Sequence, residues 1–274
     1  MKRLALAVLL LATTTARAQF FPDPDYQRVL IPVFYFGGGS FGSQWWTDFD
    51  LISTEGNFTL GRAFLQGNPG CPALCGCDAK AEAEAWKAES VCPTFEGPAG
   101  LVLHVPRTVN RDEVHTYARV RDMSRQADRA GTQIPVVWED QLHDGMMLLD
   151  IPRDDRFRTT LRLFDVFQWS TEFQLRFHDM AKLRRGEAGP LFETTITVEH
   201  EEGGTPGRFP GRPAYAVVGD LQAAYPQLAD VQSFAIEIRG THLLISPAPP
   251  NKRFFAMVSV TNKNTNEVTV VAPE

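Results

Sequence analysis

Apolar side chains recur at every second position over much of this chain. The clearest examples are the segments 173–178, 192–199 and 234–239, where apolar or aromatic residues alternate with polar ones. A period of two places alternate side chains on opposite faces of a β-strand, one face in a core and one in water. The pattern therefore predicts half-buried strands rather than amphipathic helices.

Glycine- and proline-rich segments separate these strands into many short elements. The main breaks lie at 37–42, 67–76, 185–190, 203–213 and 246–252. Many short strands without intervening amphipathic helices favour antiparallel sandwiches over a parallel α/β fold. We therefore predict an all-β fold of two immunoglobulin-like antiparallel β-sandwich domains.

A charged stretch, Arg153 to Arg156, separates two groups of predicted strands and marks the expected domain boundary. On this division, residues 19–152 form an N-terminal sandwich and residues 153–274 form a C-terminal sandwich. The run Met146 to Ile151 is assigned to the first of them.

Two short helices are also expected. Residues 78–91 are rich in Ala, Glu and Lys, which favour helix, and Asp78 is placed as an N-cap. Asp220 is positioned to cap a second helix over Leu221 to Leu228, which Pro226 keeps short.

All four cysteines lie inside a predicted insertion at 67–97: Cys71, Cys75, Cys77 and Cys92. An even number of closely spaced cysteines in an exported chain indicates disulfides, here two that would cross-link the helical insertion. A Cys75–Cys77 bridge would close a strained ring. Cys71–Cys75 with Cys77–Cys92 is favoured over Cys71–Cys77 with Cys75–Cys92. The rival is a four-thiolate zinc site, which the C-x-C step and export disfavour.

Export itself is predicted from the N-terminus. Lys2 and Arg3 precede the apolar run 4–11, and Ala16 and Ala18 occupy the −3 and −1 positions of a cleavage site. The apolar run is too short to span a bilayer, which needs about 20 residues. We predict a signal peptide at 1–18, cleaved after Ala18, and a secreted or periplasmic product.

Charge and composition narrow the expected partners. The chain has 33 acidic and 27 basic residues, a formal net charge of −6, and its basic residues are scattered. Nucleic acids and anionic lipids are held by clustered Lys and Arg, so neither is expected as a partner. No later apolar run predicts a membrane span, and export excludes intracellular nucleotide cofactors. The six histidines lack metal-ligating spacing, so no metal or other cofactor is expected.

The glycine loop 37–42 matches two catalytic patterns by sequence alone. It fits the dinucleotide pattern G-x-G-x-x-G, and with Ser40 it fits the nucleophile elbow G-x-S-x-G. Both patterns require a helix directly after the loop, whereas the residues from Ser43 to Leu51 are predicted to be a strand. A hairpin between two strands is the preferred interpretation.

Acidic residues offer weaker candidates. Asp23/Asp25 and Asp154/Asp155 lack the spaced acids and glycine of a calcium loop. Glycoside cleavage needs two carboxyl groups facing each other, and the acids considered for that role are Glu139, Asp140 and Asp144. Solvated surface acids are the simpler interpretation of the two aspartate pairs, and among 33 acidic residues the choice of a pair for glycoside cleavage is arbitrary.

Trp45 and Trp46 are the candidate binding residues. Adjacent residues of a strand point to opposite faces, so the two rings cannot both enter one core. One of them is then exposed or covered by a neighbouring domain. An exposed Trp can stack on a sugar or anchor a protein partner. The alternative is a Trp packed under the cysteine-rich insertion.

Four segments together carry a resemblance to known proteins: Gly42–Trp45, Arg121–Ala127, Ile134–Val137 and the closing stretch Val258–Val270. In these segments the chain resembles uncharacterised secreted bacterial proteins built from immunoglobulin-like sandwiches. The resemblance implies the fold and export. It implies no activity and gives no residue a role.

The sequence thus predicts an exported, non-catalytic β-sandwich protein with a binding, adhesion or structural role. Its expected ligand is a carbohydrate or a protein at the cell surface. The competing hypothesis is an extracellular hydrolase of glycans or esters that uses acidic residues or Ser40.

Overall fold

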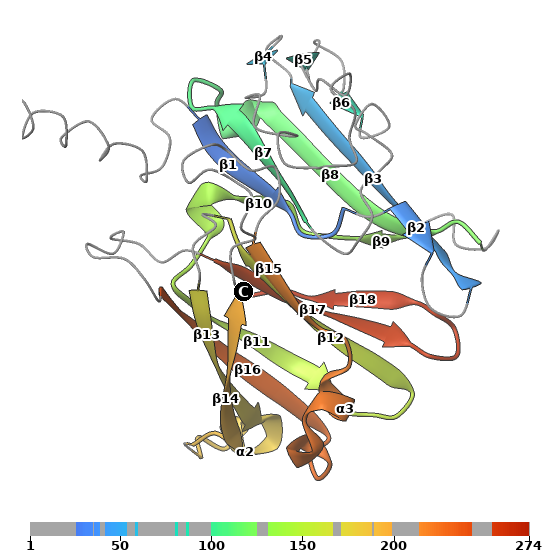
Figure 1. Ribbon diagram of the computed structural model, residues 1–274, viewed down its shortest axis with the longest axis vertical. Helices are drawn as coiled ribbons and strands as arrows, with labels where there is room; N and C mark the ends of the chain where they lie inside the picture. Colours follow the sequence, from blue (N-terminus) through green and yellow to red (C-terminus); the bar gives the residue numbers. More distant parts are fainter. Residues whose placement is uncertain are drawn as a thin grey trace, which may run out of the picture.

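The computed structural model describes two stacked β-sandwiches, drawn in blue to green and in yellow-green to red in Figure 1. All strand pairings among the described residues are antiparallel, so the predicted all-β antiparallel fold is confirmed. The described residues are 26–34, 36–38, 42–53, 58–59, 80–81, 86–87, 100–124, 131–166, 171–187, 189–198, 214–242 and 254–273.

The first sandwich packs two sheets face to face. Sheet I has the strand order β10-β1-β7, and sheet II has the order β2-β3-β8-β9 with β6 added to β3. Their inner faces enclose a core that includes Phe49, Leu51, Leu101 and Leu103. The strand bounds are β1 Tyr26–Ile31, β2 Phe36–Gly38, β3 Gln44–Ser53, β6 Trp86–Lys87, β7 Leu101–Pro106, β8 Val114–Asp122, β9 Thr132–Gln133 and β10 Val137–Trp138.

The second sandwich is also built from two sheets. Sheet III has the order β11-β16-β13-β14, and sheet IV has the order β15-β12-β17-β18. On β13 the fully buried Phe173, Leu175 and Phe177 alternate with partly exposed residues, as the period-two pattern predicts. The bounds are β11 Gly145–Pro152, β12 Phe157–Asp165, β13 Thr171–Asp179, β14 Phe192–Val198, β15 Ala214–Val218, β16 Ser233–His242, β17 Phe255–Asn262 and β18 Val268–Val271.

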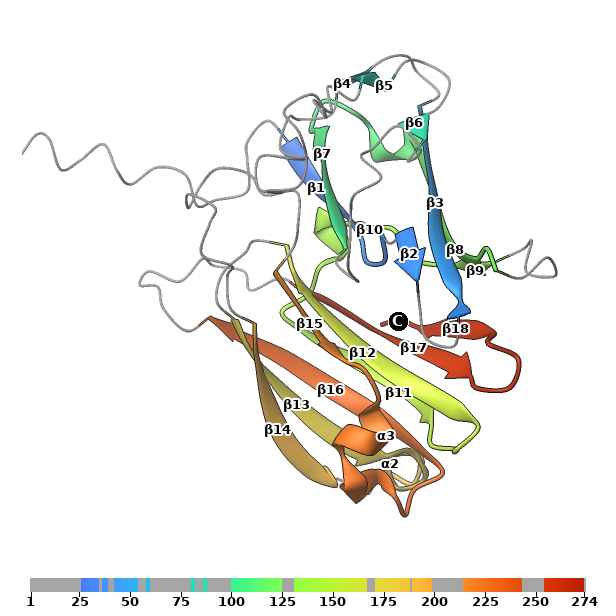
Figure 2. The same ribbon diagram turned by 45° about the vertical axis from the view of Figure 1, so that its right-hand side comes forward.

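A third apolar core joins the two sandwiches. Leu30 and Val102 of sheet I pack with Phe164 and Met257 of sheet IV, and all four are at most 1% exposed. Sheet IV therefore covers the part of the outer face of sheet I that carries Leu30 and Val102, and Val270 of β18 also packs against the core of the first sandwich. Near this core β9 and β18 lie side by side (Figures 1 and 2), where the Thr132 hydroxyl donates to the Val268 carbonyl oxygen at 2.7 Å.

The second sandwich begins upstream of the predicted boundary. β11 pairs with β16, and its Met146, Leu148 and Ile151 enter the core of the second sandwich. The charged stretch 153–156 is the turn between β11 and β12, not a linker between domains. Polar turns join strands within a domain as readily as they join domains, which is why composition alone misplaced the boundary.

The predicted helix at 78–91 is wrong where the structure describes that segment. β5 (Lys80–Ala81) pairs with β4 (Phe58–Thr59), and β6 pairs with the edge of β3. Strand pairing at a sheet edge has overridden the helix propensity of Ala, Glu and Lys, which is only a weak preference. The four cysteines and residues 1–18 lie outside the described residues.

The helices of the described residues are short. α3 (Leu221–Ala224) is capped by Asp220, whose carboxylate accepts from the Gln222 and Ala223 amides, and Pro226 opens the following 3-10 turn η5 (Pro226–Leu228). This second helix was predicted correctly. The others are α2 (Met180–Arg184) and the 3-10 turns η3 (Arg111–Glu113) and η4 (Glu139–Gln141). Over the ranges that the structure covers, no helix has the length and hydropathy to cross a membrane.

Candidate binding face of the first sandwich

Strand β3 presents two different faces. Thr47, Phe49 and Leu51 are buried against sheet I. Their neighbours Trp46, Asp48, Asp50 and Ile52 therefore lie on the outer face of sheet II, away from the core.

Strand β8 continues this outer face. Val114, Ala118 and Asp122 are buried, so the outward positions are His115, Tyr117, Arg119 and Arg121. The pairing register sets Trp46 opposite Arg121, Asp48 opposite Arg119, Asp50 opposite Tyr117 and Ile52 opposite His115. We call these eight residues the β3–β8 face.

One acid and one arginine of this face form a closed ion pair. Arg121 Nη2 donates to Asp48 Oδ1 at 2.9 Å, and Arg121 Nε lies 2.6 Å from Asp48 Oδ2. The two side chains are 28% and 26% exposed. A two-point contact of this kind fixes the orientation of both groups more than it stabilises the fold, since solvent screens part of the attraction.

A second acid and arginine on the same face are not paired. The Arg119 guanidinium carbon lies 4.8 Å from the centroid of the Tyr117 ring, a cation–π contact. Asp50 is half-buried, lies opposite Lys87 of β6 as well as Tyr117, and its carboxylate makes no hydrogen bond or ion pair in the described part of the chain. The Tyr117 hydroxyl oxygen is buried and also lacks a hydrogen-bond partner there.

The two tryptophans lie on opposite faces of β3. Trp46 belongs to the β3–β8 face, whereas Trp45 lies on the side of β3 that carries Thr47 and Phe49, opposite Asp122 in the register. Both are partly exposed. The Asp122 carboxylate accepts hydrogen bonds from the Gln44 amide and from Ser124, so it closes the end of this strand pair.

The glycine loop joins two paired strands. β2 and β3 are antiparallel, with Gly38 opposite Gln44 and Gly37 opposite Trp45. Ser40 lies outside the described residues. Because β3 follows the loop directly, neither the nucleophile elbow nor the dinucleotide pattern has the helix that it requires.

The acids considered for glycoside cleavage do not face one another as a catalytic pair. Glu139 is 8% exposed and accepts from Arg107 Nη2 at 2.8 Å and from the Arg28 amide at 2.9 Å. Asp140 pairs with Arg111 at 2.9 Å, and Asp144 is an exposed residue before β11. Glu139 thus ties β1 to the segment after β10, which is a structural role.

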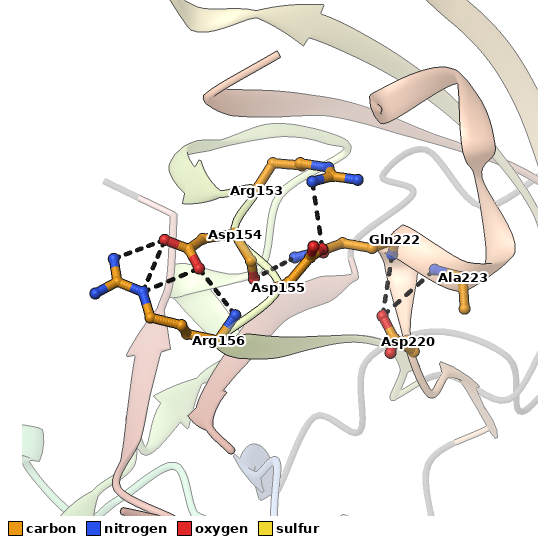
Figure 3. A network of polar contacts seen from close by, with 7 residues as sticks. All are labelled: Arg153, Asp154, Asp155, Arg156, Asp220, Gln222 and Ala223. Atoms are coloured by element: carbon orange, nitrogen blue, oxygen red, sulfur yellow. Dashed lines mark hydrogen bonds and ion pairs between the residues drawn. The ribbon is translucent and has the colours of Figure 1, made fainter. Parts of the chain in front are cut away.

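The predicted calcium candidates at 154–155 are engaged by arginines in the β11–β12 turn (Figure 3). Asp154 accepts from the Arg156 amide at 2.8 Å and from its guanidinium at 2.6 Å. These bonds lower the pKa of Asp154 from 3.8 to about 2. Asp155 pairs with Arg153 at 3.3 Å. Asp23 and Asp25 lie outside the described residues.

In the described ranges, no three His, Cys, Asp or Glu side chains gather as metal ligands. Comparison of the chain with protein families, curated proteins and solved structures finds no match. The function must therefore be argued from this chain's own residues.

The sequence pointed to one member of the β3–β8 face, Trp46, and missed its neighbours on β8. The alternation of Tyr117, Arg119 and Arg121 with small or apolar residues is visible in the sequence. The register between β3 and β8, which brings Asp50 opposite Tyr117, is not visible there.

Proposed function

We propose that this protein is an exported, non-catalytic binding protein that holds its ligand on the β3–β8 face. The observation that carries the proposal is the grouping of two aromatic rings, two acids and two arginines on a sheet face turned away from the core. Aromatic rings and arginines are enriched where proteins bind partners, since they combine apolar contact with directed hydrogen bonds.

The outer faces of the other three sheets offer less to a ligand. Sheet IV covers the outer face of sheet I at Leu30 and Val102, and the aromatic residues Phe164 and Phe255 of sheet IV are buried in the same contact. The outer face of sheet III carries a ladder of ion pairs between Arg176, Glu193 and Glu237. His178 lies beside Glu237 on that face, but none of the described residues there is Phe, Tyr or Trp.

An immunoglobulin-like relationship is part of the proposal for the second sandwich. Its support is the central arrangement, in which β12 neighbours β15 and β13 neighbours β16, as strands B, E, C and F do in immunoglobulin domains. The outer strands differ: β11 lies beside β16 and β17 lies beside β12, the reverse of the usual placement of first and last strands. Export rests on the predicted signal peptide and on the resemblance to secreted bacterial proteins.

Binding of the mature chain to arrays of oligosaccharides and of peptides tests the proposal. The variant is Arg121→Glu, which breaks the pair with Asp48 and reverses one charge on the face. The matched control is Arg239→Glu on β16, since Arg239 also pairs with a carboxylate, that of Glu237, but on sheet III.

We expect at least one bound ligand whose affinity falls about tenfold or more in Arg121→Glu, as loss of a charged hydrogen bond implies. The same affinity should be unchanged in Arg239→Glu. Equal loss in both variants would place the ligand elsewhere, and turnover on ester or glycan substrates would favour the hydrolase instead.

A further inference from the structure

Three polar groups of the β3–β8 face have no hydrogen-bond or ion-pair partner in the part of the chain that the structure describes. They are the Asp50 carboxylate, the Arg119 guanidinium and the Tyr117 hydroxyl. Asp50 lies directly opposite Tyr117, and Arg119 is the next outward residue along β8. Each of the three side chains is half-buried.

The neighbouring pair of Asp48 and Arg121 shows that an acid and an arginine at diagonal positions on β3 and β8 can form an ion pair. Asp48 lies opposite Arg119 and pairs diagonally with Arg121, two residues further along β8. By the same diagonal the partner of Asp50 would be Arg119. Arg119 instead lies over the Tyr117 ring, so Asp50 and Arg119 are not paired with each other, and we call these two residues the open pair.

Asp50 and Arg119 keep access to water and to a ligand, whereas the Tyr117 hydroxyl oxygen is shielded and lacks a partner among the described residues. Polar groups shielded from water lose more by lacking a partner than they gain from an average hydrogen bond. Such groups in a folded protein call for an explanation, and a bound ligand is one of the few available. Arg119 can leave the Tyr117 ring at small cost, because cation–π contacts at partly exposed sites are weak.

We propose that the open pair binds a neutral glycan through two adjacent sugar hydroxyls. One hydroxyl donates to the Asp50 carboxylate, and the neighbouring hydroxyl oxygen accepts from the Arg119 guanidinium. The apolar C–H face of the sugar then lies on the Tyr117 ring, and the Tyr117 hydroxyl gains the hydrogen bond that it lacks. A hydroxyl can donate to Asp50 or accept from Arg119, whereas Asp50 would repel an anionic ligand and Arg119 a cationic one, which favours an uncharged ligand.

This inference rests on the proposed function and adds the ligand class. The probes are neutral gluco-, manno-, xylo- and galacto-hexaoses, a hexauronate and a peptide array, each applied to the intact mature chain. The variants are Asp50→Asn, Arg119→Lys and Tyr117→Phe. Glu193→Gln, which removes a charge from the outer face of sheet III, is the matched control.

We expect at least one neutral hexaose to bind, about tenfold or more weakly in Asp50→Asn and Arg119→Lys, and unchanged in Glu193→Gln. Tyr117→Phe should weaken binding severalfold without lowering the midpoint of thermal unfolding, because the hydroxyl has no hydrogen-bond partner among the described residues. If Tyr117 only stabilised the fold, Tyr117→Phe would lower the ligand affinity and the midpoint of thermal unfolding together.

The inference is overturned if no neutral hexaose binds, or if one binds equally well to Asp50→Asn. It is also overturned if only the hexauronate or only peptides bind. A ligand lost in Arg121→Glu but retained in Asp50→Asn would leave the proposed function standing and refute the diol site alone.

Discussion

Replacement of Leu30 by alanine tests whether the two sandwiches form one structural unit. Leu30 is 1% exposed and points from sheet I into the core shared with sheet IV. Leu103 lies on the same sheet, is fully buried, and points the other way, into the core of the first sandwich. The pair thus matches in residue type, burial and sheet, and differs only in which core it fills.

Removal of a buried leucine side chain costs about 2–5 kcal/mol, the sum of lost transfer free energy and the cavity left behind. Since Leu30 is as buried as Leu103, we expect Leu30→Ala and Leu103→Ala to lower the free energy of unfolding by similar amounts within this range. An exposed or loosely covered leucine would cost less than about 0.5 kcal/mol.

Guanidinium unfolding followed by tryptophan fluorescence and by far-ultraviolet circular dichroism measures both effects. We expect one transition that coincides in the two signals for the wild type and for both variants. Two separate wild-type transitions, or a Leu30→Ala cost below about 1 kcal/mol beside a large cost for Leu103→Ala, would refute the shared core.

Three further predictions concern two turns and the N-cap of α3. By carboxyl NMR, Asp154 should titrate near pH 2, and its pKa should return toward 3.8 in Arg156→Ala. Because the pKa is lowered in the folded protein, the contribution of Asp154 to stability is complete above about pH 4 and disappears toward pH 2. An unchanged titration in Arg156→Ala would contradict the assigned hydrogen bonds. Gly131→Ala should lower the free energy of unfolding by about 1–3 kcal/mol, more than Gly186→Ala does. Both glycines have positive φ, but only at Gly131 would a Cβ lie 2.6 Å from a carbonyl oxygen. Equal unfolding midpoints would disprove that clash. Asp220→Ala should cost about 1 kcal/mol through loss of the cap of α3, and an unaltered denaturation curve would argue against the cap.

The alternation of buried and exposed side chains made the strands of the second sandwich predictable. Phe173, Leu175 and Phe177 show why, since a one-residue slip would move all three into water. The sequence also located the cap at Asp220 and the stop at Pro226, because both act on residues next to them.

Features that depend on distant partners were not predictable in this way. β11 was assigned to the first domain because its pairing with β16 joins residues far apart in the chain. One signal was overlooked: Val29-Leu30-Ile31 and Leu101-Val102-Leu103 are unbroken apolar runs, which indicate strands buried on both faces. The open pair on the β3–β8 face could not be anticipated, because it depends on a cross-strand register.

The apolar contact between sheets I and IV has a consequence for how this chain can change over evolution. Neither half can be transferred to another protein, duplicated or lost alone without uncovering the apolar surface of Leu30 and Val102 or of Phe164 and Met257. Such newly bared patches promote self-association. The two sandwiches must therefore be inherited together, and a recognition surface on the first keeps a constant orientation toward whatever the second contacts.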